Sequence, residues 1–204
     1  MEGGVKTVDL GENSVKMSHL LGVLTLVVVS TQAATGANPV VVMETSMGKI
    51  KIELFEEKAP ISVRNFLNYV DKKHYDGLIF HRVIEDFMIQ GGGVDTELKD
   101  RKAGAPIKNE SDNGLKNERG TLAMARTRDP DSATSQFFIN VVNNDRLDRS
   151  PQQIGYCVFG RVIDGIDVVD KIRRVETGPK GPFDKDCPLV NVVIKSVRRV
   201  EAAK

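Results

Sequence analysis

The 204-residue sequence predicts a mainly β fold, a closed or nearly closed antiparallel barrel that follows an N-terminal leader. Three observations predict it. Short apolar runs recur along the chain between glycine, asparagine and aspartate residues, two stretches have helical spacing, and one segment alternates strictly between apolar and polar residues. A parallel sheet would need a crossover helix between successive strands, and two helices are too few for that.

A hairpin and a helix come first. The runs Val40–Glu44 and Lys49–Leu54 flank a short turn, and the alternation of the second run predicts a strand with one face in water. Pro60 begins a helix, because its fixed φ and missing N–H suit the first turn. This helix has one apolar stripe at i, i+3, i+4 and i+7, formed by Val63, Phe66, Leu67 and Val70. Gly77 ends the segment.

The rest of the chain predicts further strands and one more helix. Ile166 to about Arg173 has helical spacing, and Leu189–Val197 predicts a closing strand. Short apolar runs predict strands at Leu78–Val83, Thr121–Ala125, Gln136–Val142 and Tyr156–Val162.

The N-terminal segment resembles a secretory signal peptide. Leu20–Val29 is apolar but shorter than the roughly 20 residues that span a bilayer, and small residues with A-x-A-like spacing follow it. We expect an extension and signal at 1–37, cleavage near Ala33 to Ala37, and a domain at 38–204 in the periplasm or secreted, without stable membrane insertion. The alternatives are a short buried strand and an uncleaved anchor.

The residues before the apolar run do not suit a signal peptide, whose first region is positively charged. Acids outnumber lysines there, with Glu2, Asp9 and Glu12 against Lys6 and Lys16. Translation starting at Met17, or at Val15, would remove this disagreement.

Composition excludes several classes of function. The chain has 29 Lys+Arg against 28 Asp+Glu, a net charge of +1, which is too small for sequence-independent binding of nucleic acid. A hydrophobic content of 40% excludes a disordered chain. The two cysteines, Cys157 and Cys187, lie among apolar neighbours, so we expect buried free thiols, with a disulfide as the alternative in an oxidising compartment.

The usual catalytic motifs are missing from the sequence. The three histidines have no ligand spacing, and neither HExxH nor GxSxG occurs, so we expect no metal and no cofactor. Gly91-Gly92-Gly93 is not followed by GK[ST], which favours a turn or a close backbone approach. Asp129-Pro130-Asp131 favours a solvated turn over a calcium loop. The chain is then a binding module or an enzyme that needs none of this machinery.

Two dense stretches remain, Phe80–Gly93 and Met124–Asn140. A strand period of two places Arg82 on the same face as Phe80 and Ile84, where a charge requires a pocket. The alternatives are a surface salt bridge for Arg82 and a plain core position for Phe87, Met88 and Phe138.

The segments FHRVIEDFMIQGGG, SATSQFFINV and GYCVFGRVIDGIDVVDKI resemble the signature segments of the cyclophilins, the cyclophilin-type peptidyl-prolyl cis-trans isomerases. The similarity runs from Val40 to about Val200, and the loop at 124–131 is similar to that of the exported bacterial branch. The resemblance implies a closed eight-stranded antiparallel barrel capped by two α-helices. It also implies a monomer without cofactor that isomerises X-Pro bonds in exported proteins and assists their folding.

The resemblance also implies roles for individual residues. Arg82, Phe87 and Gln90 are the expected catalytic residues, and Arg82 reaches toward the substrate's prolyl nitrogen. Gln90 and Gln136 bond the substrate or hold Arg82. The expected proline pocket and peptide contacts are formed by Phe87, Met88, Gln90, Ala125, Arg126, Thr127, Gln136, Phe138, Leu147 and Tyr156.

Three positions depart from the family pattern. Arg126 stands in place of the usual asparagine, in a segment that contacts the peptide through its backbone, and Tyr156 stands where many members carry histidine. Arg146 replaces the tryptophan of eukaryotic members, so we expect weak cyclosporin binding. The alternative function is a proline-peptide-binding chaperone or scaffold module with little isomerase activity. A folding factor that both holds and isomerises its clients is a third.

Overall fold

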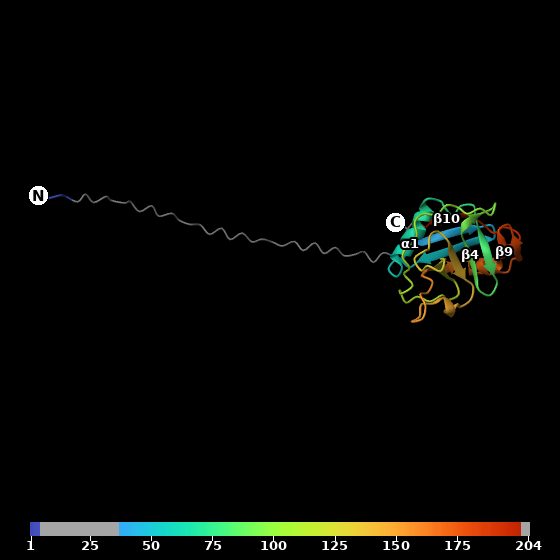
Figure 1. The fold of residues 1–204 in the computed structure, drawn as a ribbon. Helices are drawn as coiled ribbons and strands as arrows, with labels where there is room; N and C mark the ends of the chain where they lie inside the picture. Colours follow the sequence, from blue (N-terminus) through green and yellow to red (C-terminus); the bar gives the residue numbers. More distant parts are fainter. Residues whose placement is uncertain (5–36, 201–204) are drawn as a thin grey trace. The chain divides into compact units, whose positions relative to one another are not determined.

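The computed structural model describes residues 1–4 and 37–200, and its helices and strands all lie in the second range (Figure 1). The apolar run at 20–29 and nearly all of the expected signal lie outside the described residues, so the leader stays a prediction. Within the described ranges, no helix is long and apolar enough to span a membrane.

Eight strands in residues 37–200 close into an antiparallel barrel in the order β1-β10-β3-β4-β6-β5-β7-β2. This confirms the expected fold class, and closure leaves the barrel without a free edge. The strands are β1 Val40–Thr45, β2 Gly48–Leu54, β3 Leu78–Ile84, β4 Met88–Asp95, β5 Thr121–Met124, β6 Phe137–Asn140, β7 Val158–Asp164 and β10 Val193–Arg199.

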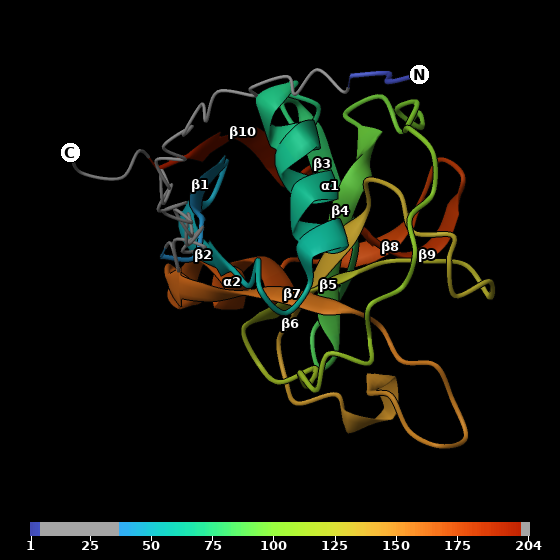
Figure 2. The same ribbon diagram turned by 90° about the vertical axis from the view of Figure 1, so that its left-hand side faces the viewer.

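The two α-helices of this range begin where the sequence predicts them. They are α1 Pro60–Asp71, with Pro60 in its first turn, and α2 Ile166–Arg173. Figure 2 shows α1 in front of the barrel strands. The apolar stripes of both helices belong to one buried cluster with the inward side chains of the strands, and Phe66 of α1 packs edge-on against Phe137 with ring centroids 5.6 Å apart. The helices therefore complete the barrel core.

A second hairpin, which the sequence analysis missed, lies outside the barrel. It consists of β8 Thr177–Lys180 and β9 Phe183–Pro188, and β9 packs against β3. The predicted closing strand Leu189–Val197 is correct only in its second half. Leu189 and Val190 are 43% and 82% exposed and lie in the loop that connects β9 to β10. The Lys180 ammonium donates to the carbonyls of Pro188 and Leu189 and holds the start of this loop in place.

The glycine triplet lies inside strand β4, so the expected turn is wrong and the expected close backbone approach is correct. A Cβ on Gly91 would lie 3.1 Å from the carbonyl oxygen of Ile79, and one on Gly92 would lie 2.8 Å from that of Ser135. Both cysteines are buried and free, as expected. Burial raises the pKa of the Cys157 thiol to about 11.

Candidate active site

A β-bulge decides where Arg82 points. Phe80 pairs with Gly91 and Arg82 pairs with Gln90, so two steps along β3 match one step along β4. Beyond the bulge Val83 rejoins Phe80 in the barrel core, which leaves Arg82 on the outer face. The expectation that Arg82 shares a face with Phe80 is therefore wrong, because the bulge reverses the alternation between them.

Strand pairing brings the predicted site residues together on this outer face. Arg82 pairs with Gln90, Gln90 with Phe138, and Phe138 with Ala123, which makes one row across β3, β4, β6 and β5. A buried apolar cluster, separate from the barrel core, forms a floor beside the row from Met88, Ala123, Phe138 and Val158. Partly exposed side chains pack against this floor: Phe87, Ala125, Leu147 and Tyr156.

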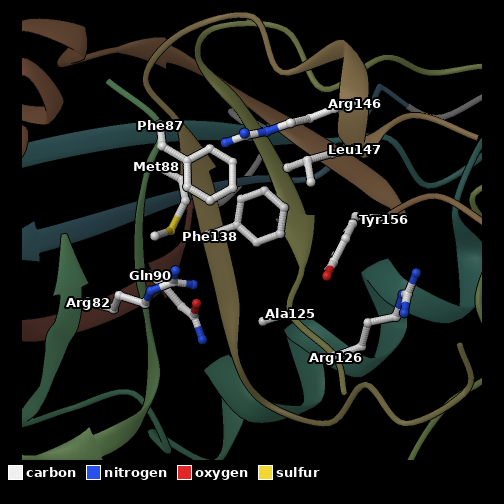
Figure 3. Close-up of a pocket in the computed structure, with 10 residues that line it drawn as sticks. All are labelled: Arg82, Phe87, Met88, Gln90, Ala125, Arg126, Phe138, Arg146, Leu147 and Tyr156. Atoms are coloured by element: carbon white, nitrogen blue, oxygen red, sulfur yellow. The ribbon is translucent and has the colours of Figure 1, made fainter. Parts of the chain in front are cut away.

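A cavity of about 470 Å³ opens above the floor (Figure 3). It shares Gln90, Ala125 and Arg126 with a smaller cavity of about 190 Å³. The larger cavity is lined by Arg82, Phe87, Met88, Gln90, Ala125, Arg126, Phe138, Arg146, Leu147 and Tyr156. The smaller adds Thr127, Ser132, Thr134 and Gln136. Every residue predicted for the site lines one cavity or both.

Polar contacts join the two glutamines to each other and Arg82 to an acid. The Gln90 amide donates to the Gln136 side-chain carbonyl at 2.8 Å. The Arg82 side chain is 44% exposed, and its Nε lies 3.7 Å from an Asp186 carboxylate oxygen on β9. Arg82 therefore forms the surface salt bridge considered as an alternative and also lines the cavity.

Burial keeps the neighbouring histidine neutral. His81 is 5% exposed, packs its ring 5.6 Å from that of Phe183, and has its pKa lowered to about 4, mainly by desolvation. The group beside Arg82 is thus uncharged at neutral pH.

Two further arginines stack on aromatic rings at the cavity. The Arg126 guanidinium lies 4.4 Å from the centre of the Tyr156 ring and donates to the backbone carbonyls of Thr127 and Ile154. The Arg146 guanidinium lies 4.6 Å from the centre of the Phe87 ring. Such stacking fixes an arginine side chain without removing its charge. Arg146 was noted in the sequence only for cyclosporin, and the structure adds it to the cavity wall.

The sequence analysis missed a buried polar network that supports the site. Asn144 donates through its amide to the carbonyl of Phe87 and to the side chain of Asn140. Asn117 donates through its backbone and its amide to the Asp148 carboxylate, just after the 3₁₀ turn Asp145–Leu147. These bonds hold the segments that carry Phe87, Arg146 and Leu147. These asparagines follow no motif or spacing that gave a signal of this role.

The sequence matches the family described as "Cyclophilin type peptidyl-prolyl cis-trans isomerase/CLD" over residues 40–199. A peptidyl-prolyl cis-trans isomerase of Acinetobacter baylyi is 55% identical over 165 residues, covering 79% of this chain and 88% of that protein. Peptidyl-prolyl cis-trans isomerase A of Dickeya dadantii is 45% identical over 185 residues, covering 91% of this chain and 97% of that protein.

Solved structures show the same fold. A crystal structure of a cyclophilin type peptidyl-prolyl cis-trans isomerase of Cryptosporidium parvum has a TM-score of 0.67 at 27% identity, covering 81% of this chain and 99% of that chain. A second structure of that protein, in the presence of the dipeptide Ala-Pro, has a TM-score of 0.65 at 28% identity and covers 80% and 99%. The chain therefore belongs to the cyclophilin-type peptidyl-prolyl cis-trans isomerases and is an enzyme of that class.

Proposed function

We propose that this isomerase acts on exported polypeptides, that it assists their folding, and that Arg82 lowers the barrier by stabilising the twisted prolyl bond. The observation that carries the mechanism is the row on the outer face. It places the Arg82 guanidinium at the edge of an apolar floor formed by Met88 and Phe138.

The reaction explains why a guanidinium suits this place. Rotation about a peptide bond meets a barrier of about 18–20 kcal/mol because it breaks amide resonance. In the twisted state the lone pair localises on the prolyl nitrogen, and the Arg82 guanidinium donates a hydrogen bond to it. Because this bond strengthens as the amide twists, it stabilises the transition state more than the bound substrate.

The other lining residues hold the substrate. Met88, Phe138 and Leu147 enclose the proline ring and exclude water, which strengthens the hydrogen bond from Arg82. Gln90, fixed by its bond to Gln136, presents a polar edge to the peptide beside Arg82. The Cryptosporidium relative studied with Ala-Pro supports a proline-containing peptide as the ligand of this cavity.

The test of the mechanism is exchange NMR on a short X-Pro peptide with the wild type, Arg82→Ala and Arg64→Ala. Arg64 is an exposed arginine on α1, away from the cavity, and serves as the control. We expect Arg82→Ala to lower kcat/KM by two to three orders of magnitude, about 3–4 kcal/mol at roughly 1.4 per decade, and Arg64→Ala to leave it unchanged.

The same measurement separates isomerase from binding module. A folded Arg82→Ala protein with near-normal turnover would refute the role of Arg82. Binding of the peptide without acceleration by the wild type would identify a proline-binding chaperone or scaffold instead.

Export of the protein to the periplasm or beyond rests on the leader. The match to the Dickeya relative covers more residues than the domain expected at 38–204 contains, so it includes part of the segment before it. N-terminal sequencing of the protein from its own cell tests the proposal. A mature start near residues 34–38 would support cleavage, and an intact Leu20–Val29 would contradict it.

Cyclosporin binding tests the assignment of Arg146. We propose that the protein binds cyclosporin weakly, because the Arg146 side chain covers Phe87 where eukaryotic members present an indole. We also propose that the protein is a monomer. Arg146→Trp is expected to tighten binding at least tenfold in a titration. Nanomolar inhibition of the wild type would contradict the proposal.

A further inference from the structure

The rim of the active site carries three positive charges. Figure 3 shows the guanidiniums of Arg82, Arg126 and Arg146 on different sides of the apolar floor. None of the described residues that line either cavity is an aspartate or glutamate. The protein as a whole has a net charge of only +1, so this concentration is local.

Within the described part of the chain, two of these charges have no carboxylate partner. Arg82 has Asp186 at 3.7 Å, but in residues 37–200 neither Arg126 nor Arg146 forms an ion pair. Elsewhere on this surface arginines are commonly paired, as Arg198 is with Asp76 and Arg161 with Glu53.

Acids near the site bind other groups or line neither cavity. Asp148 accepts from Asn117 and lies 3.4 Å from the Lys116 ammonium, while Asp131 accepts from the backbone of Asn109. Asp145 is the neighbour of Arg146 in the 3₁₀ turn but lines neither cavity.

Stacking on aromatic rings holds the guanidiniums of Arg126 and Arg146 in place at the rim. Arg126 is held by Tyr156 and two backbone carbonyls, and Arg146 lies over Phe87. A guanidinium fixed in this way loses little entropy on binding. Arg146 offers a carboxylate a planar pair of N–H donors, whereas both terminal nitrogens of Arg126 already donate to carbonyls, so that Arg126 contributes mainly its charge.

We infer that this active site selects proline peptides that carry a carboxylate next to the proline, and that Arg146 and Arg126 are the residues that recognise it. The inference rests on the proposed function, because it assigns the substrate class of the same site. Glutamate or aspartate directly before or after proline is favoured, and lysine at either position is repelled by the same charges.

Arg146 is exposed and Arg126 is partly exposed, which limits the size of the preference. An exposed ion pair changes an equilibrium constant by at most about fivefold, and charge complementarity also raises the association rate. Two such contacts together predict a ratio of about five- to twentyfold in kcat/KM between glutamate and lysine peptides at low salt. The ratio shrinks toward about twofold near 0.5 M salt because exposed charges are screened.

The experiment measures the dissociation constant and the exchange rate by NMR for two matched series of peptides. One series places Glu, Gln, Ala or Lys before the proline, and the other places them after it. We expect the glutamate peptide to be the best substrate in at least one series, with Gln and Ala intermediate and Lys poorest.

Variants assign the preference to residues. Arg146→Gln and Arg126→Gln each reduce the glutamate-to-lysine ratio, and Arg146→Glu moves the preference toward lysine. Arg149→Gln is the matched control, since Arg149 is an exposed arginine in the same loop that lines neither cavity of the site. Because Arg126 also bonds two carbonyls, Arg126→Lys keeps its charge and separates lost recognition from a disturbed loop.

The outcomes separate the two levels of inference. Equal rates and affinities for all peptides overturn the charge preference while the isomerase function stands. A preference that Arg149→Gln removes as fully as Arg146→Gln also overturns it, because the effect would then come from net charge alone. If no peptide isomerises faster, the proposed function fails, and the dissociation constants still decide whether the cavity prefers an acidic peptide.

Discussion

Gly92 is tightly constrained in strand β4, which carries part of the site. It lies in β4 with φ +91°, and an added Cβ would meet the carbonyl oxygen of Ser135 at 2.8 Å and the Phe137 ring at 3.0 Å. That same carbonyl accepts a hydrogen bond from the fully buried Tyr75 hydroxyl at 3.0 Å. Gly92→Ala therefore acts on the backbone conformation, on a close contact and on a buried bond.

The expected cost follows from these three effects. An alanine with positive φ costs about 1–2 kcal/mol, partly offset by about 0.4–1 kcal/mol because alanine restricts the unfolded chain. Forcing the Ser135 carbonyl away adds about 1–3 kcal/mol of overpacking, and weakening the Tyr75 bond adds about 1 kcal/mol. The sum is a loss of about 2–6 kcal/mol in the free energy of unfolding.

Gly77→Ala is the matched control. Gly77 also has a positive φ, +77°, but nothing lies within 4 Å of its added Cβ, so only the conformational cost of about 1 kcal/mol remains. At about 2–4 °C per kcal/mol, Gly92→Ala should lower the Tm by about 10 °C and Gly77→Ala by about 3 °C. Circular dichroism during thermal unfolding measures both shifts. Equal shifts for the two variants would refute the close-approach argument.

Three further outcomes follow from the site. A Cβ on Gly93 would lie 2.5 Å from the Gln136 amide nitrogen, so Gly93→Ala should displace that side chain and lower kcat/KM about tenfold in the exchange assay; unchanged turnover would contradict it. The pKa of His81 is about 4 in the folded state and 6.5 in the unfolded state, so the unfolded state binds the proton first as the pH falls. The free energy of unfolding should therefore decrease between pH 6.5 and 4. Urea titrations at several pH values should show a smaller decrease for His81→Leu than for the wild type. Asp186→Asn should lower kcat/KM about two- to fivefold without changing the Tm, because its pair with Arg82 is partly exposed; an unchanged kcat/KM would show that Asp186 does not position Arg82.

Local patterns in the sequence determined a large part of the fold. The helices at Pro60–Asp71 and Ile166–Arg173 follow from apolar spacing, and the Lys49–Leu54 strand follows from alternation. These patterns predict the elements correctly because one side of each helix or strand faces the core. Buried apolar residues therefore recur in the sequence with the period of the element. The resemblance to the cyclophilins also identified every lining residue of the two cavities except Arg146, Ser132 and Thr134.

Elements whose stability comes from neighbours gave no such pattern. β8 and β9 read as Thr-Gly-Pro-Lys and Phe-Asp-Lys-Asp-Cys-Pro, without an apolar alternation, and they form a hairpin because they pair with each other and β9 packs on β3. Leu189 and Val190 show the reverse, since an apolar run there stays exposed in a loop held by Lys180. Tertiary contacts overrode the local preference in both places.

The face of Arg82 was decided only by the tertiary structure. The sequence predicted that a charge among apolar residues needs a pocket, and from the residues alone it placed that charge on the face of Phe80. Strand pairing at Gly91 and Gln90 inserts a bulge that moves Arg82 to the outer face, beside Phe138 and Gln90. Register describes how two strands pair, so the periodicity of one strand alone does not predict where a bulge interrupts the pairing. The residue types thus predicted the chemistry of the site, and the pairing of the strands determined where on the barrel the site lies.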